Sequence, residues 1–184
     1  MDDMVKAAMA KWPNVPACYG WLGLDARGRW WMRDEQAQAA GPFASVAGDA
    51  GARLRSRGSE LRHEKLIDFI GRNYDQDERG CWYFQNGPQR VFVELELAPW
   101  VWRLQPDGRV LSHTGRDARV ETAWLDEEGR LYLGTDLGLG VVHSQDMLLA
   151  VGQIEAGAWQ PQNVSWGELV RRFGVVVSPA QRES

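Results

Sequence analysis

The chain has 184 residues, of which 44% are hydrophobic and 25% are charged, a composition ordinary for a globular protein with one sizeable core or two small subdomains sharing one. The formal net charge of −4 argues against a nucleic-acid-binding protein, because such proteins present a basic face to the phosphates. No stretch approaches the roughly 20 apolar residues that cross a membrane, and no apolar run after Met-Asp-Asp indicates a signal peptide. Cys18 and Cys81 lack C-x-x-C spacing, so we expect reduced thiols in a soluble, cytoplasmic protein.

The first part of the chain predicts a helix, a hairpin and an insertion. Apolar residues at helical spacing indicate a helix over residues 2–12, which Pro13 ends. Strands at 21–24 and 29–32 flank the turn Asp25-Ala26-Arg27-Gly28. Residues 33–57 are rich in Ala, Gly, Arg and Ser and have no periodicity, so we expect an exposed insertion that is mobile in part.

A helix and a hairpin are expected next. The apolar stripe of residues 59–72 predicts a helix with Ser59 as its N-cap. After a turn at 77–80, the aromatic residues 81–84 favour a strand, and Asn86-Gly87 is typical of a tight hairpin. Apolar and charged residues then alternate over 90–97, which predicts a strand with one buried face.

Pro99 interrupts this alternation. Before it the apolar residues stand at odd positions, and beyond it Trp100, Trp102 and Leu104 stand at even ones. Proline cannot donate to a sheet and is typical of edges and bulges. A one-residue bulge at Ala98-Pro99 would return both sets to the same core, with the two tryptophans facing it.

The remainder of the chain predicts further hairpins and one helix. Ser165-Trp166-Gly167-Glu168 has the pattern of a capping box and predicts a helix at about 165–173. Residues 178–184 form a polar tail. The expected strands are 100–104 with 109–112, 119–125 with 130–133, then 138–143, 148–154 and a last one at 175–177.

Part of the strand pattern occurs twice. DERGCWYF at Asp77 and DEEGRLYL at Asp126 begin 49 residues apart, and both Gly80 with Gly129 and Tyr83 with Tyr132 coincide. The two interpretations are a weak duplication of a strand meander and the recurrence of D-x-x-G as good hairpin chemistry. The expected fold is α+β, with two similar, mostly antiparallel β-rich halves, residues 1–104 and 105–184, which carry about one helix each and share one core.

The same segments resemble a family of bacterial proteins. The D-x-x-G-x-W-W pattern at 25–31, RGSELRHEKLIDFI at 57–70, VFVELELAPWVWRL at 91–104 and LYLGTDLGLGVVHSQDMLLAV at 131–151 resemble the proteobacterial domain-of-unknown-function family DUF1285, or a close sister of it. Residues 33–56 would be an insertion that the family lacks. The resemblance implies an α+β fold of two similar β-rich halves, and it implies no established activity.

Motifs of catalysis or cofactor binding are absent from the sequence. His63, His113 and His143 have no second His or Cys at ligand spacing, and no G-x-S-x-G, Walker loop or H-E-x-x-H occurs. GTDLGLG at 134–140 lacks the lysine and the helix of a phosphate loop, and it favours a glycine-rich strand turn. We therefore expect no catalytic residue, no metal and no cofactor.

The tryptophans and the arginines beside them are the remaining indication of function. They would suit a small anionic or aromatic ligand, held in a groove between the two halves, and the alternative is core packing with arginines on the surface. The first hypothesis is a non-enzymatic module that binds a small ligand or a protein; the others are an enzyme with dispersed Asp, Glu and His residues in the groove, and a structural homodimer. The candidate ligand-binding residues are Trp31, Trp82, Arg90, Trp100, Trp102 and Arg103.

Overall fold

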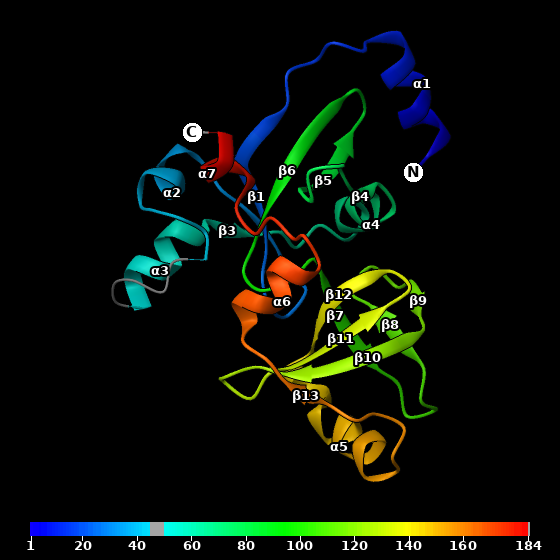
Figure 1. The fold of residues 1–184 in the computed structure, drawn as a ribbon. Helices are drawn as coiled ribbons and strands as arrows, with labels where there is room; N and C mark the ends of the chain where they lie inside the picture. Colours follow the sequence, from blue (N-terminus) through cyan, green and yellow to red (C-terminus); the bar gives the residue numbers. More distant parts are fainter. Residues whose placement is uncertain (45–49, 184) are drawn as a thin grey trace. The chain divides into compact units, whose positions relative to one another are not determined.

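The structure is a computed structural model that describes residues 1–44 and 50–183, and it divides the chain into two compact units. The first unit comprises Met1–Asp25, Arg29–Glu96 and Val176–Ser184, and the second comprises Ala26–Gly28 and Leu97–Val175. None of the helices in the described part of the chain has the length and apolar character that a membrane crossing requires. The α+β fold with two similar halves is confirmed, and Figure 1 shows one sheet for each half. The expectation of about one helix in each half is wrong, because each half contains more than one.

The first unit is built on a six-stranded sheet with the order β3-β2-β1-β6-β5-β4. Strands β1 and β6 are parallel neighbours at its centre, and the other pairs are antiparallel. Its elements are α1 (Asp3–Lys11), β1 (Cys18–Leu24), β2 (Trp30–Met32), α2 (Glu35–Ala39), α3 (Ala50–Arg57), β3 (Ser59–Glu60), α4 (Glu64–Arg72), β4 (Tyr74–Gln76), β5 (Trp82–Asn86), β6 (Gln89–Leu95) and α7 (Pro179–Glu183).

The second unit is built on a seven-stranded sheet with the order β13-β10-β11-β12-β7-β8-β9. Strands β7 and β12 are parallel neighbours, as are β10 and β13 at the edge. Its elements are β7 (Trp100–Leu104), β8 (Val110–Ser112), β9 (Asp117–Ala118), β10 (Val120–Leu125), β11 (Leu131–Thr135), β12 (Gly138–Val142), the 3-10 helix η1 (Ser144–Asp146), α5 (Met147–Glu155), β13 (Gln162–Asn163) and α6 (Trp166–Arg172).

The two sheets repeat one topology. Read from its β9 edge, the second sheet runs β9-β8-β7-β12-β11-β10, which matches β3-β2-β1-β6-β5-β4 strand for strand. The turns at Asp77 and Asp126 join equivalent strands, β4 to β5 and β10 to β11. The structure therefore favours duplication over the independent recurrence of one hairpin type.

The boundary between the units differs from the predicted halves. The sequence placed residues 97–104 in the first half and 176–184 in the second, and the structure assigns each to the other unit. The predicted bulge at Ala98-Pro99 is wrong, because β6 ends at Leu95 and β7 starts at Trp100 in the other sheet. The shift from odd to even positions thus marks a change of sheet. Both tryptophans of β7 are buried, as expected, at 1% and 0% exposure.

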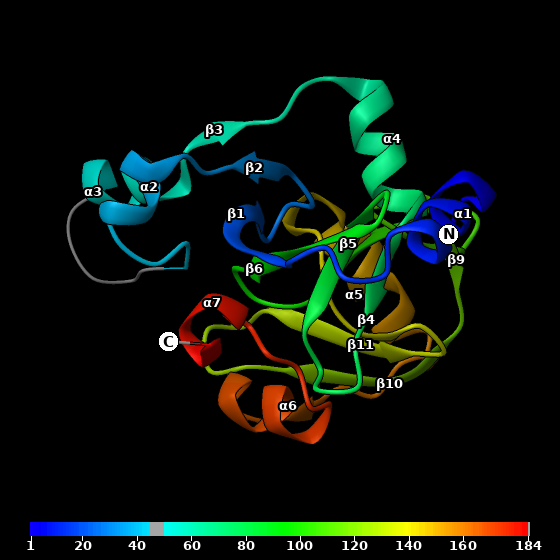
Figure 2. The ribbon, with the colours of Figure 1, turned by 90° about the horizontal axis from the view of Figure 1, so that it is seen from above.

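The insertion is exposed over most of its described residues, as predicted, but it contains two helices and a few buried side chains. Helices α2 and α3 pack against each other, and Figure 2 shows them near β2 and β3, with α4 near β5. Arg33, predicted to be exposed, is 4% exposed, and Phe43 is 2% exposed. The Arg33 guanidinium donates to four main-chain carbonyl oxygens, those of Ser56, Gly20, Ala37 and Gly41, at 2.5 to 3.3 Å. The prediction of mobility for residues 45–49 lies outside the described residues.

Three predicted elements are corrected. The helix expected from Ser59 begins at Glu64, because Ser59 and Glu60 extend the sheet beside β2, and the imidazole of His63 caps the helix instead. Residues 148–154 form most of the helix α5, not a strand, since a short apolar run of Met, Leu and Ala suits either. The last strand at 175–177 reduces to one bridge between Val176 and Cys81.

The glycine-rich segment at 134–140 makes room for tryptophan rings in the second unit. A Cβ atom on Gly140 would lie 2.4 Å from Nε1 of Trp102, and one on Gly134 would lie 2.9 Å from the ring of Trp124. The indole of Trp102 donates to the carbonyl oxygen of Leu133 at 3.1 Å. These glycines are therefore packing positions in β11 and β12, in agreement with the prediction of a strand turn.

Candidate functional site

The six predicted ligand-binding residues divide between the units. Trp31, Trp82 and Arg90 lie in the first unit, and the other three lie on β7 in the second. All four tryptophans are 7% exposed or less, so each contributes to a hydrophobic core. Both arginines are exposed. A role of this set in ligand binding stays a prediction.

Trp31 belongs to a charged cluster at the end of β1. The guanidinium carbons of Arg29 and Arg57 lie 5.5 and 5.8 Å from its ring centroid. Its indole N–H donates to the buried carboxylate of Asp25 at 3.1 Å, which also accepts from Nε of Arg29 at 2.8 Å. Arg57 forms an ion pair with Glu96. Since both cations have carboxylate partners, the cluster stabilises the turn and offers no free charge to an anion.

The two predicted arginines have different surroundings. Arg90 lies over the ring of Tyr83, with its guanidinium carbon 4.7 Å from the centroid. Arg103 forms two hydrogen bonds with the carboxylate of Asp146, at 2.7 and 3.2 Å. These bonds raise the pKa of the Arg103 guanidinium. Arg103 thus anchors the start of α5, and Arg90 contributes a stacked cation on the first sheet.

The three histidines act as hydrogen-bond acceptors for the backbone. Nδ1 of His63 accepts from the N–H of Leu66, Nδ1 of His143 from Gln145 and Nδ1 of His113 from Val101, at 3.1 to 3.3 Å. Within residues 1–44 and 50–183, no three His, Cys, Asp or Glu side chains gather in the way that a metal site requires.

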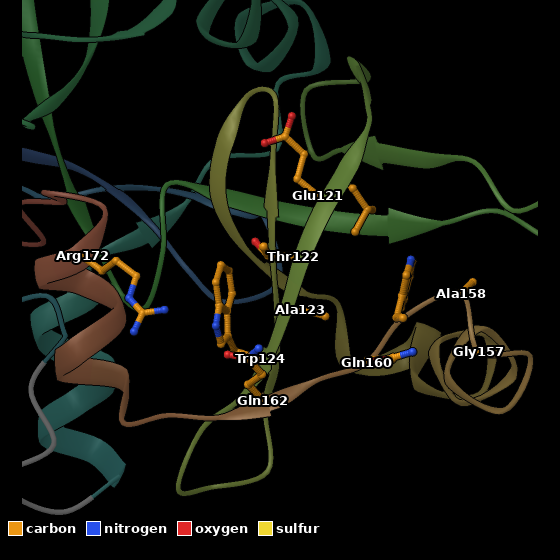
Figure 3. Close-up of a pocket in the computed structure, with 11 residues that line it drawn as sticks. Glu121, Thr122, Ala123, Trp124, Gly157, Ala158, Gln160, Gln162 and Arg172 are labelled. Atoms are coloured by element: carbon orange, nitrogen blue, oxygen red, sulfur yellow. The ribbon is translucent and has the colours of Figure 1, made fainter.

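A pocket of about 430 Å³ lies along the edge of the second sheet, where no predicted residue is found (Figure 3). Strand β13 pairs with β10 only at Trp124 and Leu125. Pro161, next to β13, has no N–H to continue the pairing. The pocket opens beside the rest of β10, and its lining residues are Val120, Glu121, Thr122, Ala123, Trp124, Gly157, Ala158, Trp159, Gln160, Gln162 and Arg172.

Trp124 is the best-fixed side chain of this pocket. It is 4% exposed, and its ring meets Phe173 edge-on at a centroid distance of 5.5 Å. Figure 3 shows Arg172 pointing from α6 toward the ring, and the guanidinium carbon lies 5.9 Å from the centroid. Nη2 of Arg172 donates to Glu168 at 2.8 Å. The arginine is thereby held over the ring with its charge partly balanced.

The lining combines aromatic surface with uncharged polar groups. Trp124 and Trp159 supply the aromatic surface, and Gln160, Gln162 and Thr122 supply amides and a hydroxyl. The charged lining residues are Glu121 and Arg172, and both are exposed. Glu121 accepts from Arg119 at 3.2 Å. An acid or base that works on a substrate is usually buried in its pocket, so this lining suits binding better than catalysis.

Sequence reasoning missed this pocket because its parts are distant along the chain. Trp124 stands in a strand that was predicted, but nothing local indicates that Gln162 pairs beside it. Arg172 comes from the last turn of α6, and the pairing of β10 with β13 brings these segments together. Trp159, in a segment without periodicity, was the one local signal.

Comparisons with known proteins identify relatives of unknown function. The family model described as "Protein of unknown function (DUF2946)" matches residues 1–180. Two solved structures are similar. A DUF1285 family protein from Silicibacter pomeroyi DSS-3 has 11% sequence identity and a TM-score of 0.47, and the match covers 83% of this chain and 84% of that chain. A DUF1285 family protein from Shewanella baltica OS155 has 16% sequence identity and a TM-score of 0.41, and the match covers 72% of this chain and 91% of that chain. Both structures are of proteins from the family that the sequence resembles. No curated protein matches the chain.

Proposed function

The chain belongs to the family described as "Protein of unknown function (DUF2946)", and we propose that it is a non-enzymatic binding module that takes one small ring-shaped ligand in the pocket beside β10. The observation that supports this function is the fixed indole of Trp124 in a pocket of about 430 Å³, within the range of small-molecule sites.

The lining favours an aromatic ligand over an anionic one. A ring can lie against the exposed parts of Trp124 and Trp159, which are 4% and 9% exposed, and its polar edge can bond to Gln160 and Gln162. An anion would have to draw Arg172 away from Glu168 and would also meet the carboxylate of Glu121. A planar, uncharged heteroaromatic molecule therefore suits the pocket best.

A thermal-shift screen with a matched pair of variants tests this function. Uncharged nucleosides, purines and indoles are added to the purified protein, and a bound ligand raises the melting temperature with its concentration. Ala158→Trp fills the pocket from an exposed position and abolishes the shift. Ala156→Trp, two residues away and outside the lining, leaves it intact. Equal shifts in both variants, or none with any ring compound in the native protein, would contradict the proposal.

A second pair of variants tests the contribution of Arg172. Arg172→Ala removes the cation above Trp124 and is expected to weaken binding by about 1 kcal/mol, or roughly fivefold. Arg171→Ala, in the same turn of α6 but outside the lining, leaves affinity unchanged. Isothermal titration with the ring compound from the screen measures both. We place the protein in the cytoplasm, because Cys18 and Cys81 are not joined in a disulfide, and a homodimer stays a prediction.

A further inference from the structure

An apolar recess lies on one face of the first sheet. The register pairs Leu22 with Met32, and Val91 with both Cys18 and Phe84, so these side chains share a face. Helix α4 packs over part of that face, where Phe69 meets Phe84 edge-on at a centroid distance of 5.4 Å. The part of the face over β1 and β2 is left open beside the helix.

The recess exists because the first unit has a helix, α4, at a position where the second unit has none. Helix α4 stands between β3 and β4, whereas only Arg119 separates the equivalent strands β9 and β10. Its buried Ile70 and half-buried Leu66 form one wall, and the sheet forms the floor. The lining residues are Cys18, Trp21, Leu22, Met32, Leu61, Leu66, Ile70, Phe84, Asn86 and Val91.

The chemistry of the recess is nearly uniform. Its volume is about 290 Å³, and none of the lining side chains is a carboxylate, a guanidinium, an ammonium or an imidazole. The hydrogen-bonding side chains in the lining are the amide of Asn86, the indole N–H of Trp21 and the thiol of Cys18. Trp21 and Met32, at 45% and 52% exposure, leave apolar surface in water at the opening. A bound apolar molecule would cover this surface.

We infer that this recess is a second binding site, specific for one small, uncharged, apolar molecule such as a fused aromatic hydrocarbon or a short acyl chain. A charged group would lose its hydration there without a counter-ion and is excluded. The volume admits a molecule of about a dozen heavy atoms and is too small for a helix of a partner protein. The inference is independent of the pocket beside β10, because all its lining belongs to the first unit.

The uncharged fluorophore 1-aminoanthracene is the probe that tests the site. In Ala158→Trp, whose pocket beside β10 is filled, its emission is expected to rise saturably with one molecule bound per chain. Met32→Glu places a carboxylate at the opening, at a position exposed enough to accept it, and lowers affinity at least about tenfold. Leu148→Glu is the matched control, since Leu148 is an exposed apolar residue on α5, in the other unit, and it leaves affinity unchanged.

Cys18 provides a second readout in the native protein. Cys18 is half-buried in the recess, while Cys81 is 1% exposed, so N-ethylmaleimide reacts with Cys18 first. Saturating 1-aminoanthracene slows this alkylation at least about fivefold if the probe occupies the recess. Unsaturable emission, an unchanged alkylation rate, or equal losses in Met32→Glu and Leu148→Glu would each overturn the inference.

Discussion

Asp77 and Asp126 bind the same two backbone N–H groups in equivalent turns. In each, Oδ1 accepts from the residues two and four positions further along, at 2.8 to 3.0 Å. Asp126 alone also accepts from Tyr132, whose hydroxyl lies 3.2 Å away in the core. Asp25 begins a turn of the same type, but this turn joins β1 to β2. In the equivalent turn of the second unit, between β7 and β8, the corresponding residue is Gln105. Duplication of the unit therefore explains why Asp77 and Asp126 recur at equivalent positions, whereas the D-x-x-G turn at Asp25 is explained by the suitability of this sequence for hairpins.

Asp126→Asn is expected to lower the free energy of unfolding by about 2–3 kcal/mol, because it removes the charged acceptor of the buried Tyr132 hydroxyl and one of the two carboxylates that pair with Arg130. Asp77→Asn, in the equivalent and more exposed turn, is expected to cost about 1 kcal/mol. Urea denaturation of both variants measures the difference. Equal losses would show that the buried contacts of Asp126 add nothing.

Gly140 and Trp102 are expected to be energetically coupled. Gly140→Ala introduces a methyl group that overlaps the indole of Trp102 and should cost about 2–3 kcal/mol. Trp102→Phe removes the indole N–H that donates to the carbonyl oxygen of Leu133 and shrinks a fully buried side chain, which should cost about 2–4 kcal/mol. The smaller ring makes room for the methyl group, so the double variant is expected to lose less than the sum. A double-mutant cycle in urea tests this, and strict additivity would show that the two positions do not touch.

Arg33→Lys is expected to destabilise the first unit by about 2–4 kcal/mol. An ammonium cannot reach the carbonyl oxygens that the planar guanidinium bonds, and the buried oxygens left over lose their donors. Limited trypsin digestion should then cut sooner after Arg53 and Arg55. Arg55→Lys, at an exposed position of α3, is the control and should digest like the native protein.

Glu94→Gln is expected to change how stability depends on pH. Burial raises the pKa of the Glu94 carboxyl, although hydrogen bonds from Ser178 and Ala180 and the charge of Arg33 act against it. The folded protein thus holds this proton more tightly than the unfolded chain, where the pKa is 4.5. The contribution of Glu94 is fully present below pH 4.5 and is lost as the pH rises through the folded-state pKa.

The variant should therefore gain stability relative to the native protein as the pH increases above 4.5. Unfolding in urea at a series of pH values measures this difference. Glu78→Gln, at an exposed turn position, is the control for the loss of one carboxylate. If the difference in the free energy of unfolding between Glu94→Gln and the native protein did not change with pH, burial would not raise the pKa of the Glu94 carboxyl.

The hairpins and the helices α1 and α6 were predictable because their signals are local. Each D-x-x-G turn carries its own hydrogen-bond acceptor, and Ser165 caps α6 at Glu168 as its capping box predicted. The strand predicted at 148–154 was wrong because a short apolar run does not distinguish strand from helix. The burial of Arg33 was not predictable, since its guanidinium donates to four backbone carbonyls that only the fold brings together.

The candidate sites were less accessible to sequence reasoning than the fold. Large aromatics beside arginines drew attention to β7, yet Trp100 and Trp102 fill the core there. The recess in the first unit depends on α4 covering only part of a sheet, and the pocket beside β10 depends on a two-residue parallel strand. Neither arrangement leaves a periodic pattern in the residues that form it.

The return of residues 176–183 to the first unit has a consequence for synthesis on the ribosome. The whole of the second unit, up to Val175, must be translated before Ser178 and Ala180 can donate to Glu94, or Val177 can accept from Leu95. Until then Glu94 in the nascent first sheet lacks these two donors, and the C-terminal segment does not yet cover that part of the sheet. The first unit begins folding early and is completed last, so the emerging chain passes through a stage in which the second unit is whole and the first is not.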